Sequence, residues 1–218
     1  MGATGSGMKN QVGLVASAAI MLAGCGGSQV AVFSAPAPAP VAVPTTPDEA
    51  AIAARAARTA LFASYTPVVF TNIDVVPLTG NANYQGYMTA NLGNINDTVT
   101  NTLSGQMTLN IEFEQFGFSL SGIAHQFFDG NDIGLNGTLV LSDGRFDRAG
   151  NPNENATINI TTSGTLTDVQ GRELMIGAQL EGDFLGSSYE GIGGDLLGRV
   201  TIDGATQNLD GIFIAAQQ

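Results

Sequence analysis

Apolar and polar residues alternate along most of the chain after Tyr65, which is the period of a β-strand with one buried face. Eight segments share one register, and each carries a glycine among the apolar residues of a single face. The eight segments are residues 84–92, 103–113, 118–124, 135–141, 156–166, 174–184, 196–202 and 209–215. The pattern therefore predicts eight strands that all turn their glycine-containing face toward one interior.

The repeated glycine predicts that the sheet closes on itself. Glycine weakens a strand interior, so its recurrence among the apolar residues needs a reason. In a small barrel the inward face is crowded, and glycine also permits the coiling that closure requires. Eight strands enclose a space that side chains can just fill. We expect an all-β fold, an eight-stranded antiparallel β-barrel over residues 65–218, with a two-sheet sandwich as the alternative.

The opposite positions of these segments are polar. They include Thr108, Asn110, Glu112, Ser119, Ser121, Asn136, Thr138, Thr157, Asn159 and Thr161. A transmembrane barrel has an apolar outside and a polar lumen, which is the reverse arrangement. The sequence therefore predicts a soluble barrel. Residues 66–76 are a candidate additional edge strand.

A short helix is predicted before the barrel, over residues 47–64. Thr46 is its expected N-cap, Pro47 its first residue, and Glu49 completes a capping box. The face expected to pack on a neighbour holds Ile52, Ala56, Ala60 and Ala63. Such a helix is either a stalk or a cover that lies on the domain.

The N-terminal residues have the three parts of an export signal. Lys9 provides a positive charge, and the thirteen residues from Val12 to Gly24 carry none. That run is shorter than the roughly 20 apolar residues of a transmembrane helix. Translation from Met1 or from Met8 fits this pattern equally well.

The end of this segment resembles the lipobox of bacterial lipoproteins. The matching residues are Leu22, Ala23, Gly24 and Cys25. The resemblance implies that residues 1–24 are removed, that Cys25 is acylated, and that the protein is anchored in a membrane by this lipid. Gly26, in place of Asp, favours sorting to the outer membrane. The alternative for Cys25 is a buried free cysteine.

Residues 25–47 read as a linker between the acylated cysteine and the helix. Alternating Ala and Pro favour an extended polyproline II segment that acts as a semi-rigid spacer. Cleavage at Cys25 leaves six arginines against nineteen acidic residues, a side-chain charge of −13. A chain of this charge repels nucleic acid, so no nucleic-acid partner is expected.

The C-terminal forty residues resemble the closing hairpin of transferrin-binding protein B-like β-barrel domains. The motif residues are Gly182, Phe184, Gly186, Glu190, Gly193, Gly194, Gly211 and Phe213. The resemblance implies a lipoprotein whose barrel binds a protein or a metal- or haem-carrying partner, without catalysis. It assigns the motif residues structural roles.

Residues that carry catalytic or metal chemistry are few. His125 is the only histidine, and we interpret it as exposed, with a haem ligand as the alternative. Residues 129–134 begin like a calcium loop, but Val140 stands where a glutamate is required, so a turn is expected. Residues 143–155 form a polar loop that either binds a partner or is a solvated hairpin tip. The glycines of residues 191–198 open no helix, which excludes a phosphate loop. No cofactor, metal site or catalytic residue is predicted.

These observations predict a lipid-anchored, non-enzymatic envelope or surface protein of the outer membrane that binds a protein partner. The alternative is a carrier that holds a small apolar ligand inside the barrel, as lipocalins do. A third reading is a purely structural envelope lipoprotein.

Overall fold

The computed structural model describes residues 47–93, 98–115, 117–147 and 157–218. The chain divides into a unit of residues 1–41 and a unit of residues 42–218, and every described residue belongs to the second. The predicted signal peptide, the lipobox with Cys25, the linker up to residue 46 and the Thr46 cap therefore lie outside the described residues. So does the side chain of Glu49.

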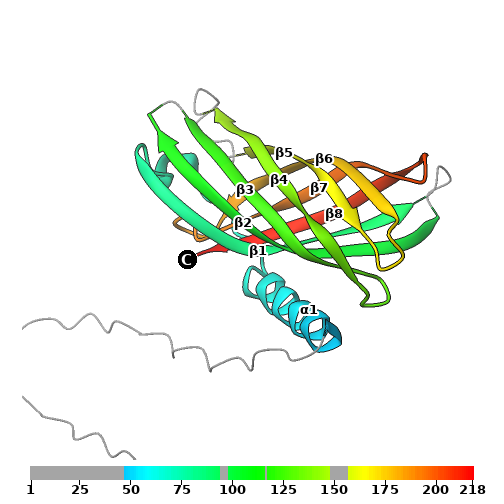
Figure 1. Cartoon of the computed structure of the whole chain (residues 1–218). Coiled ribbons are helices and arrows are strands. Elements are labelled where there is room, and N and C mark those ends of the chain that lie inside the picture. Colours follow the sequence, from blue (N-terminus) through cyan, green and yellow to red (C-terminus); the bar gives the residue numbers. More distant parts are fainter. Residues whose placement is uncertain (1–46, 94–97, 116, 148–156) are drawn as a thin grey trace, which may run out of the picture. The chain divides into compact units, whose positions relative to one another are not determined.

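Eight antiparallel strands form one closed barrel in which each strand pairs with the next and β8 pairs with β1 (Figure 1). The elements are α1 (Pro47–Ser64), η1 (Ile73–Val75), β1 (Gly80–Gly93), β2 (Val99–Glu114), β3 (Gly117–Asp129), β4 (Gly134–Asp147), β5 (Thr157–Thr167), β6 (Glu173–Leu185), β7 (Gly191–Ile202) and β8 (Ala205–Gln217). The predicted eight-stranded barrel is confirmed, and the sandwich alternative is wrong because the strands form a single sheet.

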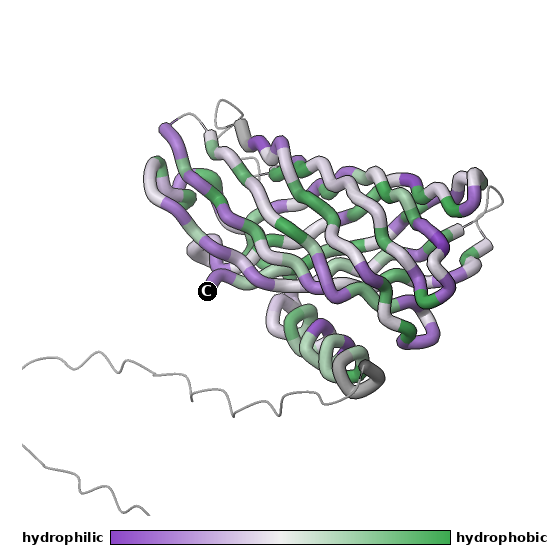
Figure 2. The backbone as a smooth tube through the Cα atoms, viewed as in Figure 1, coloured by the Kyte–Doolittle hydropathy of each residue, from purple (hydrophilic) through white to green (hydrophobic). Residues whose placement is uncertain are grey.

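The predicted strand faces are also confirmed. Buried and exposed residues alternate along β1, β2 and β6, and the hydropathy of successive residues alternates with them (Figure 2). The buried positions are those of the glycine-containing register, so the large apolar side chains fill the interior. The positions between them are mostly polar and face outward.

Two Asp-Gly pairs contain an aspartate with positive φ, but one pair lies in a turn and the other in a β-bulge. Asp203 (φ 51°) and Gly204 (φ 80°) form a two-residue turn between β7 and β8. The expected loop over residues 143–155 is wrong at its start, because Asp143 is part of a strand. It has φ 54° inside β4, where the pairing with β5 shifts between Ser142 and Arg145. Asp143 therefore belongs to a β-bulge, and β4 continues to Asp147.

One end of the barrel is closed by aromatic side chains. Phe113, Phe118 and Phe184 form a cluster with ring centroids 5.8–6.4 Å apart. Ile73 and Val76, from η1 and the residue after it, belong to the same core. The residues before β1 thus close this end, which we call the aromatic end.

The candidate edge strand over residues 66–76 does not form. Phe70 makes a single bridge to Leu185, supported by hydrogen bonds from Thr71 N to Phe184 O (2.9 Å) and from Gly186 N to Val69 O (2.8 Å). A closed barrel offers no free edge along its length. The segment instead bridges to the tip of β6, which extends past the Thr157–Asp183 pair.

Helix α1 has the predicted bounds, but the predicted packing face was wrong. Ile52 is 62% exposed and Ala56 is also exposed, whereas Ala51 is 2% exposed. An alanine-rich helix has no strong apolar stripe to fix its rotation. Its orientation instead follows from the close approach of small residues and from two arginines described below. Among the described residues, no helix is both long and apolar enough to cross a membrane.

Candidate functional site

The barrel interior is filled by side chains. Tyr84, Phe127, Phe184 and Phe213 are among its largest fully buried residues. The cavity that remains beside Thr162 has a volume of about 10 Å³, which is the size of one water molecule. Burial raises the pKa of Tyr84, whose hydroxyl donates to the Tyr189 carbonyl at 2.8 Å. Binding to this protein is therefore best sought on its outer surfaces and at its ends.

The motif residues of the C-terminal segment come together in the β6–β7–β8 wall, where they hold strands close. Gly182 lies opposite Gly194, and Gly194 lies opposite Phe213. A Cβ at Gly194 would overlap the Glu181 carbonyl oxygen and the Gly182 Cα. Gly211 likewise approaches the backbone of Thr89 and Ala90. These positions are structural, because a side chain there would push the strands apart.

The turn between β6 and β7 is organised by Glu190. Its carboxylate accepts hydrogen bonds from Ser188 N (2.8 Å) and Ser187 Oγ (3.1 Å). Burial alone would raise the pKa of Glu190, but these hydrogen bonds hold it below its usual value. Gly186 (φ 90°) lies against this carboxylate, where a Cβ would overlap Oε2. Glu190 and Gly186 therefore shape a turn. The remaining motif residue, Gly193, faces outward on β7 beside Leu185.

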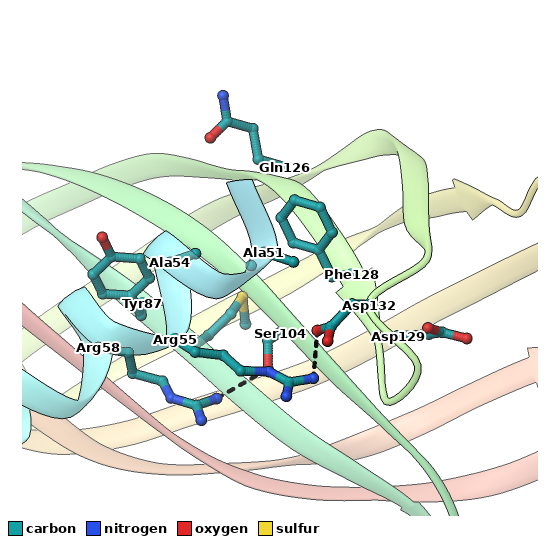
Figure 3. A pocket seen from close by; sticks show the side chains of 12 residues that line it. Ala51, Ala54, Arg55, Arg58, Tyr87, Ser104, Gln126, Phe128, Asp129 and Asp132 are labelled. Atoms are coloured by element: carbon teal, nitrogen blue, oxygen red, sulfur yellow. Dashed lines mark hydrogen bonds and ion pairs between the residues drawn. The ribbon is translucent and has the colours of Figure 1, made fainter. Parts of the chain in front are cut away.

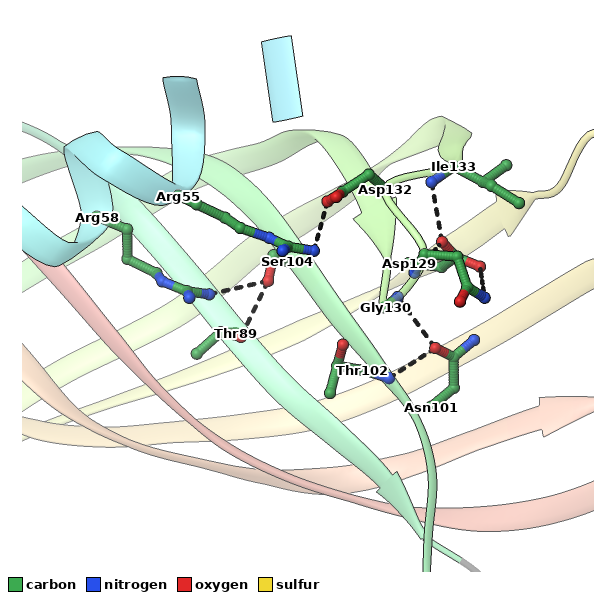
Figure 4. Close-up of polar contacts among 11 residues, drawn as sticks. Arg55, Arg58, Thr89, Asn101, Thr102, Ser104, Asp129, Gly130, Asp132 and Ile133 are labelled. Carbon is green, nitrogen blue, oxygen red and sulfur yellow. Dashed lines mark hydrogen bonds and ion pairs between the residues drawn. The ribbon is translucent and has the colours of Figure 1, made fainter. Parts of the chain in front are cut away.

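Helix α1 is held against the outer wall by two arginines (Figures 3 and 4). Arg55 forms an ion pair with Asp132, in the turn between β3 and β4. Arg58 Nη1 donates to Ser104 Oγ at 3.0 Å, and Ser104 lies 3.0 Å from the Thr89 hydroxyl. Burial, followed by the nearby Arg55, lowers the pKa of Arg58. The helix thus covers part of β1 and β2.

The contact between α1 and the barrel is close. The gap between Ala51, Ala54, Tyr87 and Phe128 has a volume of only about 20 Å³. At its other end the helix passes into Tyr65, whose hydroxyl donates to the Glu190 carbonyl at 2.9 Å. α1 therefore runs along the barrel from the Asp132 turn toward the aromatic end.

A hollow of about 570 Å³ lies on the outer wall of β1, β2 and β3. It is within the size range of small-molecule sites. The exposed side chains that line it are polar: Asn81, Asn83, Asn110, Glu112, Ser119 and Ser121. The sequence pattern placed four of these residues on the outer face, but it gave no indication that the wall is concave there.

Five large apolar side chains are exposed together near the aromatic end. Each is 47–58% exposed, and they are Val68, Val69, Phe70, Val75 and Leu78. We call this set the apolar belt. Exposed apolar side chains that occur singly are normal, whereas a contiguous group indicates an interaction surface. Sequence analysis missed the belt, although the uninterrupted apolar run Val68–Phe70 departs from strand alternation and was the available signal.

His125 and residues 129–134 are the remaining candidates for haem or metal chemistry. His125 lies on β3, partly exposed, paired with Gln106 of β2. The described residues contain no cluster of three or more His, Cys, Asp or Glu side chains that could hold a metal ion. The expected turn at residues 129–134 is confirmed, because the Asp129 carboxylate accepts hydrogen bonds from Asn131 N (2.8 Å) and Ile133 N (2.9 Å) (Figure 4).

Two further segments singled out in the sequence are the polar residues 143–155 and the glycine-rich residues 191–198. The predicted loop 143–155 begins inside β4, and its residues 148–155 lie outside the described part of the chain. Residues 191–198 are part of strand β7 and open no helix, in agreement with the exclusion of a phosphate loop.

The turn between β5 and β6 contains a well-bonded carboxylate. Asp168 accepts hydrogen bonds from Gln170 N (2.8 Å), Arg172 N (2.9 Å) and Arg172 Nε (2.7 Å). The backbone hydrogen bond from Arg172 is the main cause that holds the pKa of Asp168 below its usual value. The carboxylate is therefore more stable in the folded chain than in the unfolded one.

Asp168→Asn is expected to lower the melting temperature at pH 7. Between pH 7 and pH 3, the melting temperature of the variant should fall less than that of the wild type. The folded pKa is depressed. The stabilisation by the Asp168 carboxylate is hence fully present above its unfolded-state pKa of about 3.9. It is lost as the pH falls through the pKa of the folded state. Thermal unfolding measured from pH 3 to pH 7 checks this. The control is Asp210→Asn, on the outer face of β8, and an unchanged pH profile for Asp168→Asn would contradict the assignment.

The fold and surfaces together define a closed, up-and-down β-barrel with a filled interior, a helix on its wall and an apolar belt at one end. No protein-family model matches the chain, and no curated protein matches its sequence.

Proposed function

We propose that the protein is a lipid-anchored lipoprotein of the outer membrane whose barrel binds a protein partner without catalysis. The lipobox residues 22–25 support the anchor, and the motif resemblance of residues 182–213 supports a binding role. The polar outer wall supports a barrel that depends on the lipid for its attachment. The whole chain has a single histidine and a single cysteine, which are the side chains that most often act as general base and as thiol nucleophile.

The apolar belt is the observation that carries the proposal. A filled interior leaves outer surfaces as the place for a large partner, and the belt places five exposed apolar side chains within residues 68–78. Apolar and aromatic side chains at the centre of an interface supply most of its binding energy. Phe70 is the aromatic member of the belt, so we assign it the central contact.

The belt lies at the aromatic end, where Phe70 bridges to Leu185. The Arg55–Asp132 ion pair joins the middle of α1 to the turn between β3 and β4, at the other end of the barrel. This contact therefore leaves the belt uncovered.

A second candidate is a carrier of a small apolar ligand, and a depression at the Asp132 end favours it. This depression has a volume of about 180 Å³, a floor that includes Leu92, Leu135 and Leu174, and polar groups such as Arg172 at its rim. It is smaller than most small-molecule sites. A lipid or other apolar ligand found by native mass spectrometry of the purified protein would favour this function.

A photo-crosslinking amino acid at position 70, in intact cells that make the protein, tests the partner proposal. We expect a discrete crosslinked product with a protein. Phe70→Asp should weaken association by roughly 30-fold, the effect of losing an interface contact worth about 2 kcal/mol.

The matched control is position 169. Val169 is 68% exposed and lies in the turn between β5 and β6, at the opposite end of the barrel. A crosslinker there should give no product, and Val169→Asp should leave association unchanged. The proposal would be overturned by the absence of a protein product at position 70.

A further inference from the structure

We infer that the hollow on the outer wall of β1, β2 and β3 is a binding site for a neutral glycan. This site is separate from the apolar belt, and the inference stands whether or not the belt binds a protein. It rests on the geometry of the hollow, the types of side chain that line it, and the absence of bonds among them.

The polar side chains form a regular grid. Asn81, Glu112 and Ser119 are directly opposite one another on the three strands and make one row. The second row, two residues further along each strand, is Asn83, Asn110 and Ser121. Neighbouring strands lie about 4.8 Å apart, and residues two apart on one strand are separated by about 6.8 Å. Polar groups therefore face the hollow at fixed, closely spaced positions.

These side chains make no hydrogen bonds with other described residues. Elsewhere on the wall, opposite polar groups bond to each other, as in Thr89–Ser104 (3.0 Å), Thr157–Asp183 (3.1 Å) and Thr201–Thr206 (3.3 Å). The directly opposite Asn83 and Asn110 could form such a pair but do not. Their donors and acceptors are thus available to a ligand.

The chemistry of the grid matches sugar hydroxyl groups. An asparagine amide presents an acceptor and two donors in one plane, and a carboxylate accepts two hydrogen bonds at once. Adjacent hydroxyl groups on a sugar ring, each a donor and an acceptor, are complementary to such planar groups. Three amides, one carboxylate and two hydroxyls therefore suit a polyhydroxylated ligand better than one with a single polar group.

Charge and polarity disfavour other ligands. No lysine or arginine lines the described hollow, and Glu112 repels anions. Arg145, opposite Ser119 on β4, lies outside the lining. The apolar lining residues Ile111, Phe113 and Leu120 turn their side chains into the barrel core, so an apolar ligand finds little contact. Gly80 adds no side chain, which leaves the backbone open to close approach.

A glycan microarray with the full-length protein tests the inference. The array carries neutral oligosaccharides together with sialylated and sulfated ones. We expect retention on neutral oligosaccharides and at least tenfold weaker binding by the Asn83→Ala/Asn110→Ala double variant, measured by titration with the best neutral oligosaccharide. These side chains are exposed and unbonded, so the double variant should keep the melting temperature of the wild type.

The matched control is Asn91→Ala, an exposed outward residue of β1 outside the hollow. Its affinity should equal that of the wild type. The inference is overturned if no neutral oligosaccharide is retained, if acidic glycans bind more tightly than neutral ones, or if the double variant binds as well as the wild type. A crosslinker at position 83 that captures a protein instead of a glycan would also overturn it.

Discussion

Cys25→Ser is expected to move the protein from the membrane fraction to the soluble fraction as a folded barrel. If Cys25 carries the lipid, its loss removes the acyl chains that hold the protein at a bilayer. The described outward strand positions are mostly polar, so the described part of the barrel wall has no continuous apolar band with which to remain inserted. The measurement is fractionation of cells, followed by thermal unfolding of the released protein.

Ser28→Ala is the control for this experiment, because it lies in the same segment and outside the lipobox. It should stay in the membrane fraction. A Cys25→Ser protein that remains membrane-integral would contradict the lipid anchor. One that aggregates would contradict a soluble barrel.

Gly194→Val is expected to prevent the barrel from closing. At this position β7 approaches β6 so closely that even a Cβ would overlap backbone atoms of Glu181 and Gly182. Backbone cannot rotate aside as a side chain can, and the interior beyond it is filled by Phe213. Overpacking of a core usually costs about 1–3 kcal/mol, and a clash with the backbone of β6 is expected to exceed that range. The expected result is insoluble or largely unfolded protein.

Gly177→Ala is the matched control, since Gly177 lies on β6, faces outward and has no atom within 4 Å of its hypothetical Cβ. Alanine there should leave the free energy of unfolding unchanged or raise it by up to about 1 kcal/mol. Denaturant unfolding of both variants provides the comparison. A Gly194→Val protein as stable as the wild type would show that this strand contact is not required.

The barrel was predictable because the residue pattern that closure requires is local in the sequence. A glycine in the apolar register, as at Gly182 or Gly211, is visible within a few residues of sequence. The bulge at Asp143 was not predictable by the same means. Asp-Gly favours positive φ, and both a turn and a bulge satisfy that preference. Only pairing with the neighbouring strands β3 and β5, both distant from Asp143 in the chain, selects the bulge.

The surfaces were harder to predict than the fold because they depend on segments that are distant in sequence. Asn83 and Asn110 meet only through the register of β1 with β2. The rotation of α1 is fixed by partners on other elements, Asp132 and Ser104, and not by an apolar stripe of its own. The residues of the C-terminal motif were singled out by a resemblance alone, and the close strand contacts at Gly182 and Gly194 depend on pairing partners that the sequence does not show.

The pairing of β1 with β8 has a consequence for the order of events during biosynthesis. Tyr84 pairs with Gln217, so the ring of strands is incomplete until the last strand has left the ribosome. Until then β1 and the most recently made strand both present unpaired edges, which are prone to wrong pairing. Contacts this distant in sequence also form slowly. For the exported precursor that we propose, this delay is an advantage, because the polypeptide cannot reach its native form before its strand β8 is available.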